Sequence, residues 1–459
     1  MIKGLVSIII LSYNQVEYTK QCLDSIKCYT QDVPHEIIIV DNASEKETLL
    51  FLKSLKDVKL IMNTQNKGFA GGCNQGIEAA NGQFIMLLNN DTIVTEKWLF
   101  NMVNCLEEKP EISMVGPLTN ATVGKQMIDV PYGDDLILMQ QFAKEIANGP
   151  AKKWRTLRLV AFCILIRRSL IDEIGLLDTR FEIGNYEDDD FNIRALNAGK
   201  KSYICKNSFI HHFMNISFKQ KDIQREQIMM NNKVKLEDKW DNLDWNHHAV
   251  YNKNMLNRVL EQKGKTILHL GCGLGALAME LKENNPDCRI VGVENHQIRK
   301  KVSSMFLNEV YPWDINFEFL KRFNHLEFDS IIIEGMLELS GMELLKKAMP
   351  FLKDNGLMIL RVLNARHVTT LERTMVGKVG GNLLCASSPG FHHFFYGDIS
   401  KDLEKLGYWV NEEIKVRKSL STFQEELLQQ LKKHSADCEE ASIYNRIYVM
   451  KKMNRYKRG

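Results

Sequence analysis

The sequence predicts an α/β protein with two sheet-containing domains joined by a helical connector. Two separate series of short apolar runs alternate with helix-length stretches, which is the pattern of parallel sheets covered by crossover helices. Between the two series, residues 219–262 are polar and charged and lack the glycine and serine enrichment of a flexible linker. A chain of 459 residues is long enough for two or three domains. We therefore predict domains at 1–218 and 263–452, a connector at 219–262 and a basic tail at 453–459.

The composition excludes several classes of protein. Hydrophobic residues make up 44% of the chain and charged residues 25%, with a net charge of +3, which gives no general case for a nucleic-acid partner. The ten cysteines include no C-x-x-C pair, so neither a zinc centre nor a disulfide framework is predicted. No apolar run has the form of a signal peptide or approaches the ~20 residues of a membrane span. We expect a cytoplasmic protein, with the basic tail as the segment suited to peripheral contact with the anionic inner face of the cell membrane.

The predicted strands of the first domain are short apolar runs, each followed by polar residues. They span residues 6–11, 36–40, 58–62, 84–88 and 160–166, and a further run ends at 209–212. Helical stretches at 16–28 and 46–56 separate the first three strands. Runs this apolar are typical of strands buried on both faces. Because ligands of open α/β sheets bind outside the carboxyl ends of the strands, the polar residues there form the first candidate site.

The polar residues at this edge follow three different strands. They are Ser12, Asn14, Asp41, Asn42, Asn90 and Asp91. Asp91 could hold a divalent cation, and a cation with few protein ligands usually shares its coordination shell with phosphates. An ordinary strand followed by an Asx turn is the alternative interpretation of the segment around Asp91.

A glycine-rich segment lies between two of these strands. Residues 66–76 read N-K-G-F-A-G-G-C-N-Q-G, and a helix is predicted to begin near Cys73. Glycine lets backbone amides approach a ligand closely, the helix N-terminus favours anions, and Lys67 adds a cation. The segment therefore favours contact with phosphates, and a simple tight loop is the alternative.

Two later clusters carry chemistry. Residues 187–190 read E-D-D-D, and four adjacent carboxylates raise at least one pKa and suit a positioned general base. A solvated acidic turn that caps a helix is the alternative interpretation. A histidine pair at 211–212 ends an apolar strand, and one of its members could join Asp91 on a metal ion.

Four segments of the first domain occur in the order and spacing of a known family. V-S-I-I-I-L-S-Y-N, I-I-I-V-D-N-A-S, N-K-G-F-A-G-G-C-N-Q-G and L-L-N-N-D-T resemble family-2 glycosyltransferases with the GT-A fold. The glycine-rich segment is most similar to the rhamnosyltransferase-like branch. The resemblance implies an inverting transfer of a hexosyl or deoxyhexosyl group from a dTDP- or UDP-linked donor to a hydroxyl of a glycan or glycoprotein. It also implies a divalent cation, Mg²⁺ or Mn²⁺.

The resemblance assigns roles to individual residues at the donor site. Asp41 would contact the nucleoside base, with Ser12 and Asn14 beside it. Asp91 is the last residue of N-N-D, which replaces the family's D-x-D, so the cation would rest on Asp91 and on a histidine that aligns slightly better with His211 than with its neighbour. The other residues predicted to bind the donor are Asn42, Lys67, Gly68, Asn74 and Asn90.

The acidic segment matches the family's E-D-x-D element. That match makes Asp188 the predicted catalytic base, with Glu187 and Asp189 as nearby alternatives. The base would take the proton of the incoming hydroxyl on the face opposite the leaving diphosphate. The cation would meanwhile stabilise the charge that grows on the phosphate oxygens.

The second domain opens with a strand, a glycine turn and a helix. The turn carries Gly271, Gly273 and Gly275, and a second strand ends at Glu294, 19 residues after Gly275. An acidic residue at that place commonly accepts hydrogen bonds from ribose hydroxyls, so a dinucleotide and S-adenosylmethionine both fit.

Further segments favour one of these ligands. H-L-G-C-G-L-G, V-G-V-E and F-D-S-I-I-I-E-G-M-L-E-L resemble class I S-adenosylmethionine-dependent methyltransferases, which have a Rossmann-like fold. The resemblance implies that the three glycines and Glu294 bind the cofactor and that the domain O-methylates the glycan, making the chain bifunctional. Residues 338–340 read E-L-S where relatives often carry E-H-L. This departure favours the alternative, a non-catalytic module that binds the acceptor or a partner.

Overall fold

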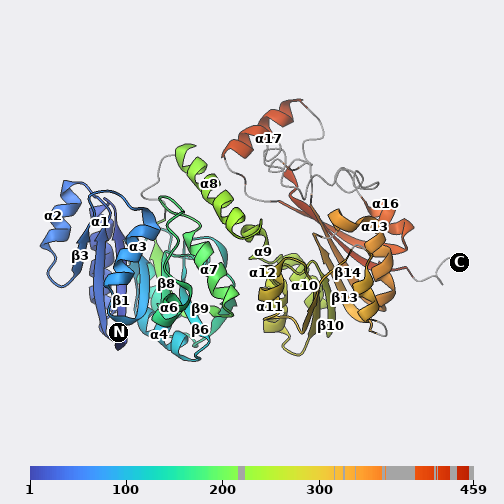
Figure 1. Ribbon diagram of the computed structural model, residues 1–459, viewed down its shortest axis with the longest axis horizontal. Helices are drawn as coiled ribbons and strands as arrows, with labels where there is room; N and C mark the ends of the chain where they lie inside the picture. The colour runs from blue at the N-terminus through green and yellow to red at the C-terminus, as the bar shows by residue number, and fades with distance from the viewer. Residues whose placement is uncertain are drawn as a thin grey trace. The chain divides into compact units, whose positions relative to one another are not determined.

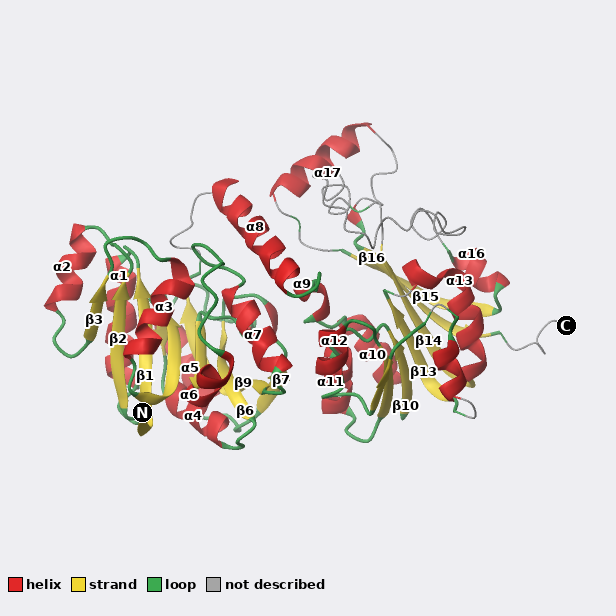
Figure 2. Ribbon diagram, viewed as in Figure 1, coloured by secondary structure: helices red, strands yellow, loops and turns green. Residues whose placement is uncertain are grey.

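The computed structural model folds into two compact units, which divide between Val250 and Tyr251. It describes residues 1–214, 223–314, 316–323, 326–335, 337–363, 367, 399–417, 420, 422–434 and 442–453. Each unit is an α/β unit built around its own sheet (Figures 1 and 2). The predicted α/β class is therefore confirmed. The division lies within the predicted connector, so its first two helices belong to the first unit and its last to the second.

The first unit contains a mixed sheet with helices on both faces (Figure 2). Its strands are β1 (Ile2–Ser12), β2 (His35–Asp41), β3 (Lys59–Met62), β4 (Gly82–Asn89), β5 (Thr92–Val94), β6 (Ile112–Thr119), β7 (Lys153–Thr156), β8 (Cys163–Arg167) and β9 (Lys201–His212). Its helices are α1 (Val16–Tyr29), α2 (Lys46–Ser54), α3 (Gly68–Ala79), α4 (Trp98–Glu107), α5 (Leu136–Ala147), α6 (Arg168–Ile174), α7 (Glu187–Asn197), α8 (Ile223–Lys239) and α9 (Trp245–His248).

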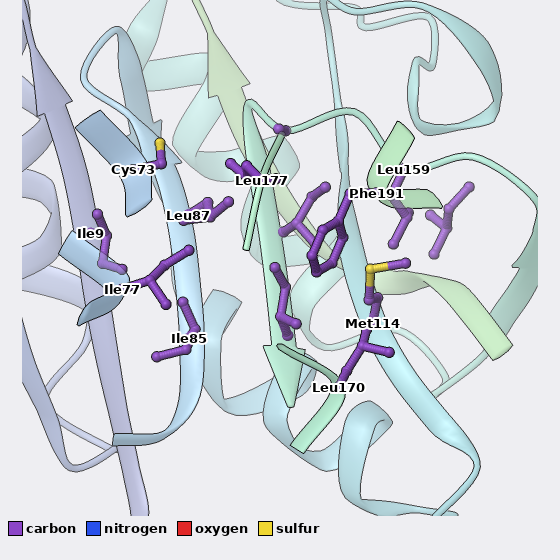
Figure 3. Close-up of a cluster of buried hydrophobic side chains, with 14 of the residues drawn as sticks. Ile9, Cys73, Ile77, Ile85, Leu87, Met114, Leu159, Leu170, Leu177 and Phe191 are labelled. Carbon is purple, nitrogen blue, oxygen red and sulfur yellow. The ribbon is translucent and has the colours of Figure 1, made fainter. Parts of the chain in front are cut away.

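The strand order in this sheet is β3-β2-β1-β4-β8-β6-β9-β5, and β7 pairs with β9. Strands β1 to β4 are parallel to one another, whereas β8 is antiparallel to β4. The apolar runs predicted as strands are buried on both faces, because alternate residues enter two separate cores. Figure 3 shows one of these cores, in which Ile9 of β1 and Ile85 and Leu87 of β4 lie beside Cys73 and Ile77 of α3.

The second unit contains a sheet of order β12-β11-β10-β13-β14-β16-β15. Its strands are β10 (Thr266–Leu270), β11 (Arg289–Val293), β12 (Glu309–Tyr311), β13 (Phe328–Glu334), β14 (Leu352–Leu363), β15 (Tyr408–Val416) and β16 (Asn445–Lys452). Its helices are α10 (Lys253–Glu261), α11 (Ala276–Asn284), α12 (Gln297–Ser303), α13 (Leu337–Ala348), α16 (Ser400–Lys405) and α17 (Thr422–His434).

In the second unit, the order in which successive strands join the sheet reverses between β10 and β13. Strands β10 to β14 are parallel, whereas β16 is antiparallel to both of its neighbours. The order of the first five strands is that of doubly wound dinucleotide-binding folds, in which ligands bind at the point of reversal. The antiparallel pair at the other end departs from an all-parallel Rossmann sheet.

Two predictions concern the membrane: the absence of a spanning segment, and contact through the basic tail. None of the described helices has the length and apolar character that a bilayer crossing requires. The basic tail lies outside the described residues from position 454 onward, so membrane contact through it stays a prediction.

Candidate active site

Two buried polar side chains at the edge of the first sheet have atoms without partners. Ser12 and Asp41 are neighbours in the parallel register of β1 and β2, and both are fully buried. The hydroxyl of Ser12 and Oδ1 of Asp41 form no hydrogen bond, while Oδ2 of Asp41 accepts one from the amide of Ser44 at 3.3 Å. A buried polar atom left unpaired costs about 1–3 kcal/mol. The two unpaired atoms, side by side, make this edge a candidate site for a polar ligand.

Three of the predicted donor-binding amides hold the backbone around this edge. Asn14 accepts from the amide of Glu45 at 2.8 Å. Asn42 accepts from the amide of Lys67 at 2.9 Å and donates to the side chain of Asn66 at 2.7 Å. Asn74 exchanges two hydrogen bonds with the backbone of Leu177, at 2.8 and 3.0 Å. These three side chains therefore hold the backbone in place around the edge. Their positions in the sequence did not predict this role.

The glycine-rich segment is mostly helical, which differs from the predicted phosphate-facing loop. Helix α3 begins at Gly68 rather than near Cys73. A Cβ atom on Gly72 would meet Cδ1 of Leu11 at 2.2 Å, and one on Gly76 would meet a methyl group of Ile9 at 2.4 Å. Two of the glycines therefore serve the close packing of α3 on β1. The helix N-terminus and the exposed side chain of Lys67 stay at the carboxyl edge.

The histidine that faces Asp91 is His212. Its Nε2 lies 3.3 Å from Oδ1 of Asp91. Its Nδ1–H donates to the carbonyl of Ala121 at 2.8 Å, and the other ring nitrogen, Nε2, is directed toward the carboxylate. The ring stacks on Phe162 with centroids 5.0 Å apart. A backbone carbonyl behind the ring is the support that metal-ligating histidines use.

The predicted His211 does not face Asp91 in the structure, which makes His212 the better candidate for the cation site. Successive side chains of a strand point to opposite faces, so only one of the pair can face Asp91. Nδ1 of His211 lies 2.9 Å from the hydroxyl of Tyr132. Burial, with a smaller contribution from His212, lowers the pKa of His211 to about 4. His211 is thus a neutral, packed side chain.

Asp91 and His212 fit a divalent cation that a ligand helps to hold. The carboxylate oxygen and the ring nitrogen converge, and the side chain of Asp91 is 17% exposed. Within the described ranges, no group of three or more potential protein ligands gathers around a common point. A cation here would therefore complete its shell with phosphate oxygens and water, as Mg²⁺ does in many nucleotide sites.

Asp188 lies beside the same short segment as this pair. Its Oδ2 accepts from the amide of Ala161 at 3.1 Å, and its Oδ1 from the amide of Asp189 at 2.9 Å. The next residue, Phe162, carries the ring on which His212 stacks, and its carbonyl accepts from Asn89 at 2.8 Å. The segment 161–162 thus brings the predicted base and the predicted cation ligands to one edge.

The other three carboxylates of the acidic segment are in different states. Glu187 is buried, and burial together with the charge of Asp188 raises its pKa well above the ordinary value. Burial raises the pKa of Asp189 to about 7 although Arg158 lies 2.7 Å away. Asp190 is paired with Arg194 at 2.8 Å. Asp188 is the partly exposed member, which agrees with its predicted role as the base.

The remaining predicted donor residue, Asn90, faces α1. Its amide donates to the hydroxyl of Thr19 at 2.9 Å. This bond holds the segment between β4 and β5 on which Asp91 sits.

The glycine turn of the second unit has the expected backbone. Gly271, Gly273 and Gly275 all have positive φ, at 77°, 55° and 80°. Oε2 of Glu294 accepts from the amide of Gly273 at 3.0 Å, and Oε1 accepts from the amides of Asn295 and His296, both at 2.9 Å. The carboxylate predicted to bind ribose therefore already holds the turn closed.

A charged cluster lies two residues before this turn. Nε2 of His269 is 2.9 Å from Oε2 of Glu334, and Arg361 donates to the other carboxylate oxygen at 2.9 Å. Burial acts to raise the pKa of Glu334, but the hydrogen bond from His269 and the charge of Arg361 outweigh it and lower that pKa. No signal within a single segment could have predicted this cluster, because its members come from three strands.

Within the first unit, the sequence is similar to that of known glycosyltransferases. Residues 7–175 match the family model described as Glycosyl transferase family 2. An uncharacterized glycosyltransferase of Haemophilus influenzae is 29% identical over 126 residues, which cover 27% of this chain and 39% of that relative. The uncharacterized glycosyltransferase YwdF of Bacillus subtilis is 27% identical over 201 residues, which cover 41% of this chain and 67% of the relative. The chain thus spans well under half of the length of the Haemophilus protein.

Among solved structures, a crystal structure of GalNAc-T7 with UDP, GalNAc and Mn²⁺ is similar over 52% of this chain and 48% of that chain. The identity is 18% and the TM-score 0.42. The family match covers β1 through α6, which include the edge where Ser12, Asp41 and Asp91 lie. Residues 7–175 of the first unit are therefore similar in sequence to family-2 glycosyltransferases.

Proposed function

We propose that the first unit transfers a sugar from a nucleoside-diphosphate donor, dTDP- or UDP-linked, to a hydroxyl of a glycan or glycoprotein with inversion. The observation that carries the proposal is the arrangement of Asp91, His212 and Asp188 around the segment 161–162. The unpaired atoms of Ser12 and Asp41 at the ends of β1 and β2 would receive the nucleoside.

The residues divide the reaction between two sides of the anomeric carbon. A bound divalent cation would supply positive charge to the departing diphosphate, and Asp91 and Nε2 of His212 are the side chains that would hold it. The carbonyl of Ala121 keeps the proton on Nδ1 of His212, so that Nε2 stays available. Lys67 and the N-terminus of α3 add further positive potential at the same edge.

Asp188 would accept the proton of the acceptor hydroxyl. The acceptor oxygen forms a bond to the anomeric carbon while the bond from that carbon to the diphosphate oxygen breaks. The amides of Ala161 and Asp189 hold the carboxylate in place. Burial and the charge of Asp188 raise the pKa of the neighbouring Glu187.

A panel of dTDP- and UDP-linked sugars tests this proposal. The intact chain, with Mn²⁺ or Mg²⁺, should release nucleoside diphosphate from at least one donor and transfer the labelled sugar to a glycan acceptor. Omission of the metal and chelation with EDTA should suppress release at least ~100-fold. Full activity in EDTA would contradict the cation site, and the absence of release from every donor would contradict the function.

For the second unit, we propose that the glycine turn binds S-adenosylmethionine and that the unit O-methylates the product of the first. Three positive-φ glycines at the point where the strand order reverses support the proposal. Gly275 also packs closely, because a Cβ there would meet Cα of Ser303 at 3.0 Å. When bound, the cofactor would supply the methyl group, and Glu294 would hold its ribose.

A non-catalytic, acceptor-binding unit is the second candidate, favoured by the occupied carboxylate of Glu294. Calorimetric titration of the intact chain with S-adenosylmethionine separates the two. Saturable binding that Gly273→Val abolishes, followed by labelled methyl transfer to a glycan, would support the methyltransferase. Absence of binding would refute it and leave the acceptor-binding unit.

A further inference from the structure

The turn between Phe181 and α7 has a strained backbone. Its residues Ile183, Gly184, Asn185 and Tyr186 have consecutive positive φ values of 63°, 144°, 76° and 77°. Three of the four are not glycine, and a β-branched residue in the left-handed region is a genuine outlier. Strain of this kind persists only where surrounding contacts enforce it, and it clusters at functional sites. The turn ends at Tyr186, which directly precedes α7 and lies two positions before Asp188.

Helix α8 supplies the contacts that enforce this turn. The side-chain amide of Asn232, which is 1% exposed, donates to the carbonyls of Glu182 and Gly184 at 3.1 Å and to that of Asn185 at 3.4 Å. Lys235 donates to the carbonyl of Arg180 at 2.9 Å. The side chain of Asn232 thus hydrogen-bonds to three carbonyls of the turn and stabilises its strained conformation.

Helix α8 and the residue after it also form ion pairs and hydrogen bonds with α7, the acidic helix that follows the turn. Lys239 lies 2.6 Å from Oδ1 of Asp190 and 2.7 Å from Oδ2 of Asp178. The indole of Trp240 donates to Asp190 at 2.9 Å, and the indole of Trp245 in α9 donates to Asp189 at 2.7 Å. Both ends of the segment that contains Asp188 are therefore fixed from α8 and α9.

On its other side the turn contacts the donor edge. The amide of Phe69 in the first turn of α3 donates to the carbonyl of Ile183 at 3.1 Å. A Cβ on Gly68 would meet the backbone nitrogen of Ile183 at 3.0 Å. The turn thus lies between the helix whose N-terminus faces the donor site and the helix that carries the base.

We infer that Asn232 is a positioning residue of the transfer reaction and acts through the turn 182–186. By holding three carbonyls of the turn, it fixes the spacing between the N-terminus of α3 and the carboxylate of Asp188. Helix α8 lies beyond the residues that match the family model, so this chain completes its active site with a segment outside that match. The inference rests on the proposed glycosyl transfer.

The main test compares Asn232→Ala with Asn231→Ala, an exposed position on the same helix. Asn232→Ala should lower kcat about 10- to 100-fold, because a shift of ~1 Å in a catalytic group costs about 10²-fold. The Kd for free UDP or dTDP should change less than about threefold, because Ser12 and Asp41 are held by β1 and β2. Asn231→Ala should leave both quantities unchanged. Equal losses in kcat and nucleotide affinity, or no loss in kcat, would overturn the inference.

A second variant separates positioning from folding. Ile183→Gly removes the left-handed strain, so its unfolding midpoint should equal or exceed that of the wild-type chain. Its kcat should nevertheless fall at least ~5-fold, because the turn is no longer confined to one conformation. Unchanged kcat in a fully folded Ile183→Gly variant would show that the strain serves no catalytic purpose.

A readout independent of activity distinguishes failure of this inference from failure of the proposed function. Amide hydrogen exchange over residues 182–192 should accelerate in Asn232→Ala and not in Asn231→Ala. Unchanged exchange would overturn the positioning role whatever the activity. Accelerated exchange in a chain whose wild type releases no nucleotide from any donor would instead refute the glycosyl transfer itself, and with it the catalytic consequence inferred here.

Discussion

The carboxyl edges of the two sheets differ in how their buried carboxylates are satisfied. In the first unit, Oδ1 of Asp41 has no partner beside the equally unpaired hydroxyl of Ser12. In the second unit, Glu294 holds three backbone amides, and Glu334 holds His269 and Arg361. The carboxylate at the first edge thus has an open position, whereas both carboxylates at the second edge are occupied, although Nδ1 of His269 is unpaired there as well. We call the two the open edge and the closed edge; sheet topology locates both, and the state of their carboxylates distinguishes them.

The strongest way to test this contrast is to replace the proposed base at the open edge, Asp188. Asp188→Asn keeps the size of the side chain and can keep one of its two hydrogen bonds from backbone amides, but it cannot accept a proton, so kcat should fall about 10²- to 10⁴-fold. Nucleoside diphosphate affinity, measured by titration calorimetry, should stay within about threefold of wild type. Asp24→Asn, on the exposed face of α1, is the control. A kcat within threefold of wild type would exclude Asp188 and point to one of its neighbours.

The closed edge should respond to substitution with lost stability. Glu334→Gln breaks a buried ion pair with Arg361, which typically costs about 3–5 kcal/mol. Because hydrogen bonding and charge lower the pKa of Glu334, its contribution is present above about pH 4.5 and is lost as the pH falls. In calorimetric unfolding at pH 7, the transition of the second unit should occur at a markedly lower temperature than in the wild-type chain.

Nucleotide release by the first unit is the internal control for that experiment and should not change. The substitution Glu343→Gln, at an exposed position in α13, should leave the transition temperatures of both units unchanged. A Glu334→Gln chain as stable as wild type would mean that the second edge is not closed by this cluster, and the contrast between the units would fail.

The histidine pair sharpens the description of the open edge. His212→Ala should weaken Mn²⁺ affinity in the presence of nucleoside diphosphate about 10- to 100-fold. His211→Ala should leave metal affinity within about threefold, because its ring contacts Tyr132 instead of Asp91. The two variants are matched in chemistry and adjacent in sequence. The reverse result would restore the alignment-based choice of His211.

A sequence could locate this edge but not its details. Runs such as 84–88 are buried on both faces, and the polar residues after them can only lie at the strand ends, so Asp41 and Asp91 were predictable. The choice between His211 and His212 depends on which face each residue takes, and the strand register that decides it is a property of the assembled sheet. The packing role of Gly72 was equally hidden, because it requires knowing that Leu11 lies beneath it.

Residues that act through distant partners were beyond prediction. Asn232 lies about fifty positions after the turn that it holds, on a helix whose composition indicated only a connector. The links from Arg158 and Trp245 to Asp189 likewise join segments that nothing in the sequence places together. For this reason α8 and α9 of the predicted connector belong to the first unit, whereas α10 belongs to the second.

The smallest expected effect concerns Glu187. Burial and the charge of Asp188 raise its pKa above 4.5, so the folded state binds the proton more tightly than the unfolded state. Stability is therefore fully present below about pH 4.5 and declines as the pH rises toward the folded-state pKa. Glu187→Gln removes this decline, and each unit of pKa shift corresponds to about 1.4 kcal/mol.

Denaturant titrations of wild type, Glu187→Gln and the exposed control Glu78→Gln at pH 5 and pH 8 measure the effect. The advantage of Glu187→Gln over wild type should grow from pH 5 to pH 8, whereas Glu78→Gln should follow wild type. Parallel pH curves for all three chains would show that Glu187 ionises normally in the folded state.

The central proposal is that Asp91 and His212 hold a divalent cation, and the coupling between Mn²⁺ and nucleotide binding tests it most directly. Affinity for UDP and dTDP should be measured with and without Mn²⁺ in wild type and Asp91→Asn. In wild type, Mn²⁺ should raise the affinity for at least one nucleotide by about 10-fold or more, and Asp91→Asn should abolish that gain. A gain that persists in Asp91→Asn, or its absence from wild type, would contradict the proposed site.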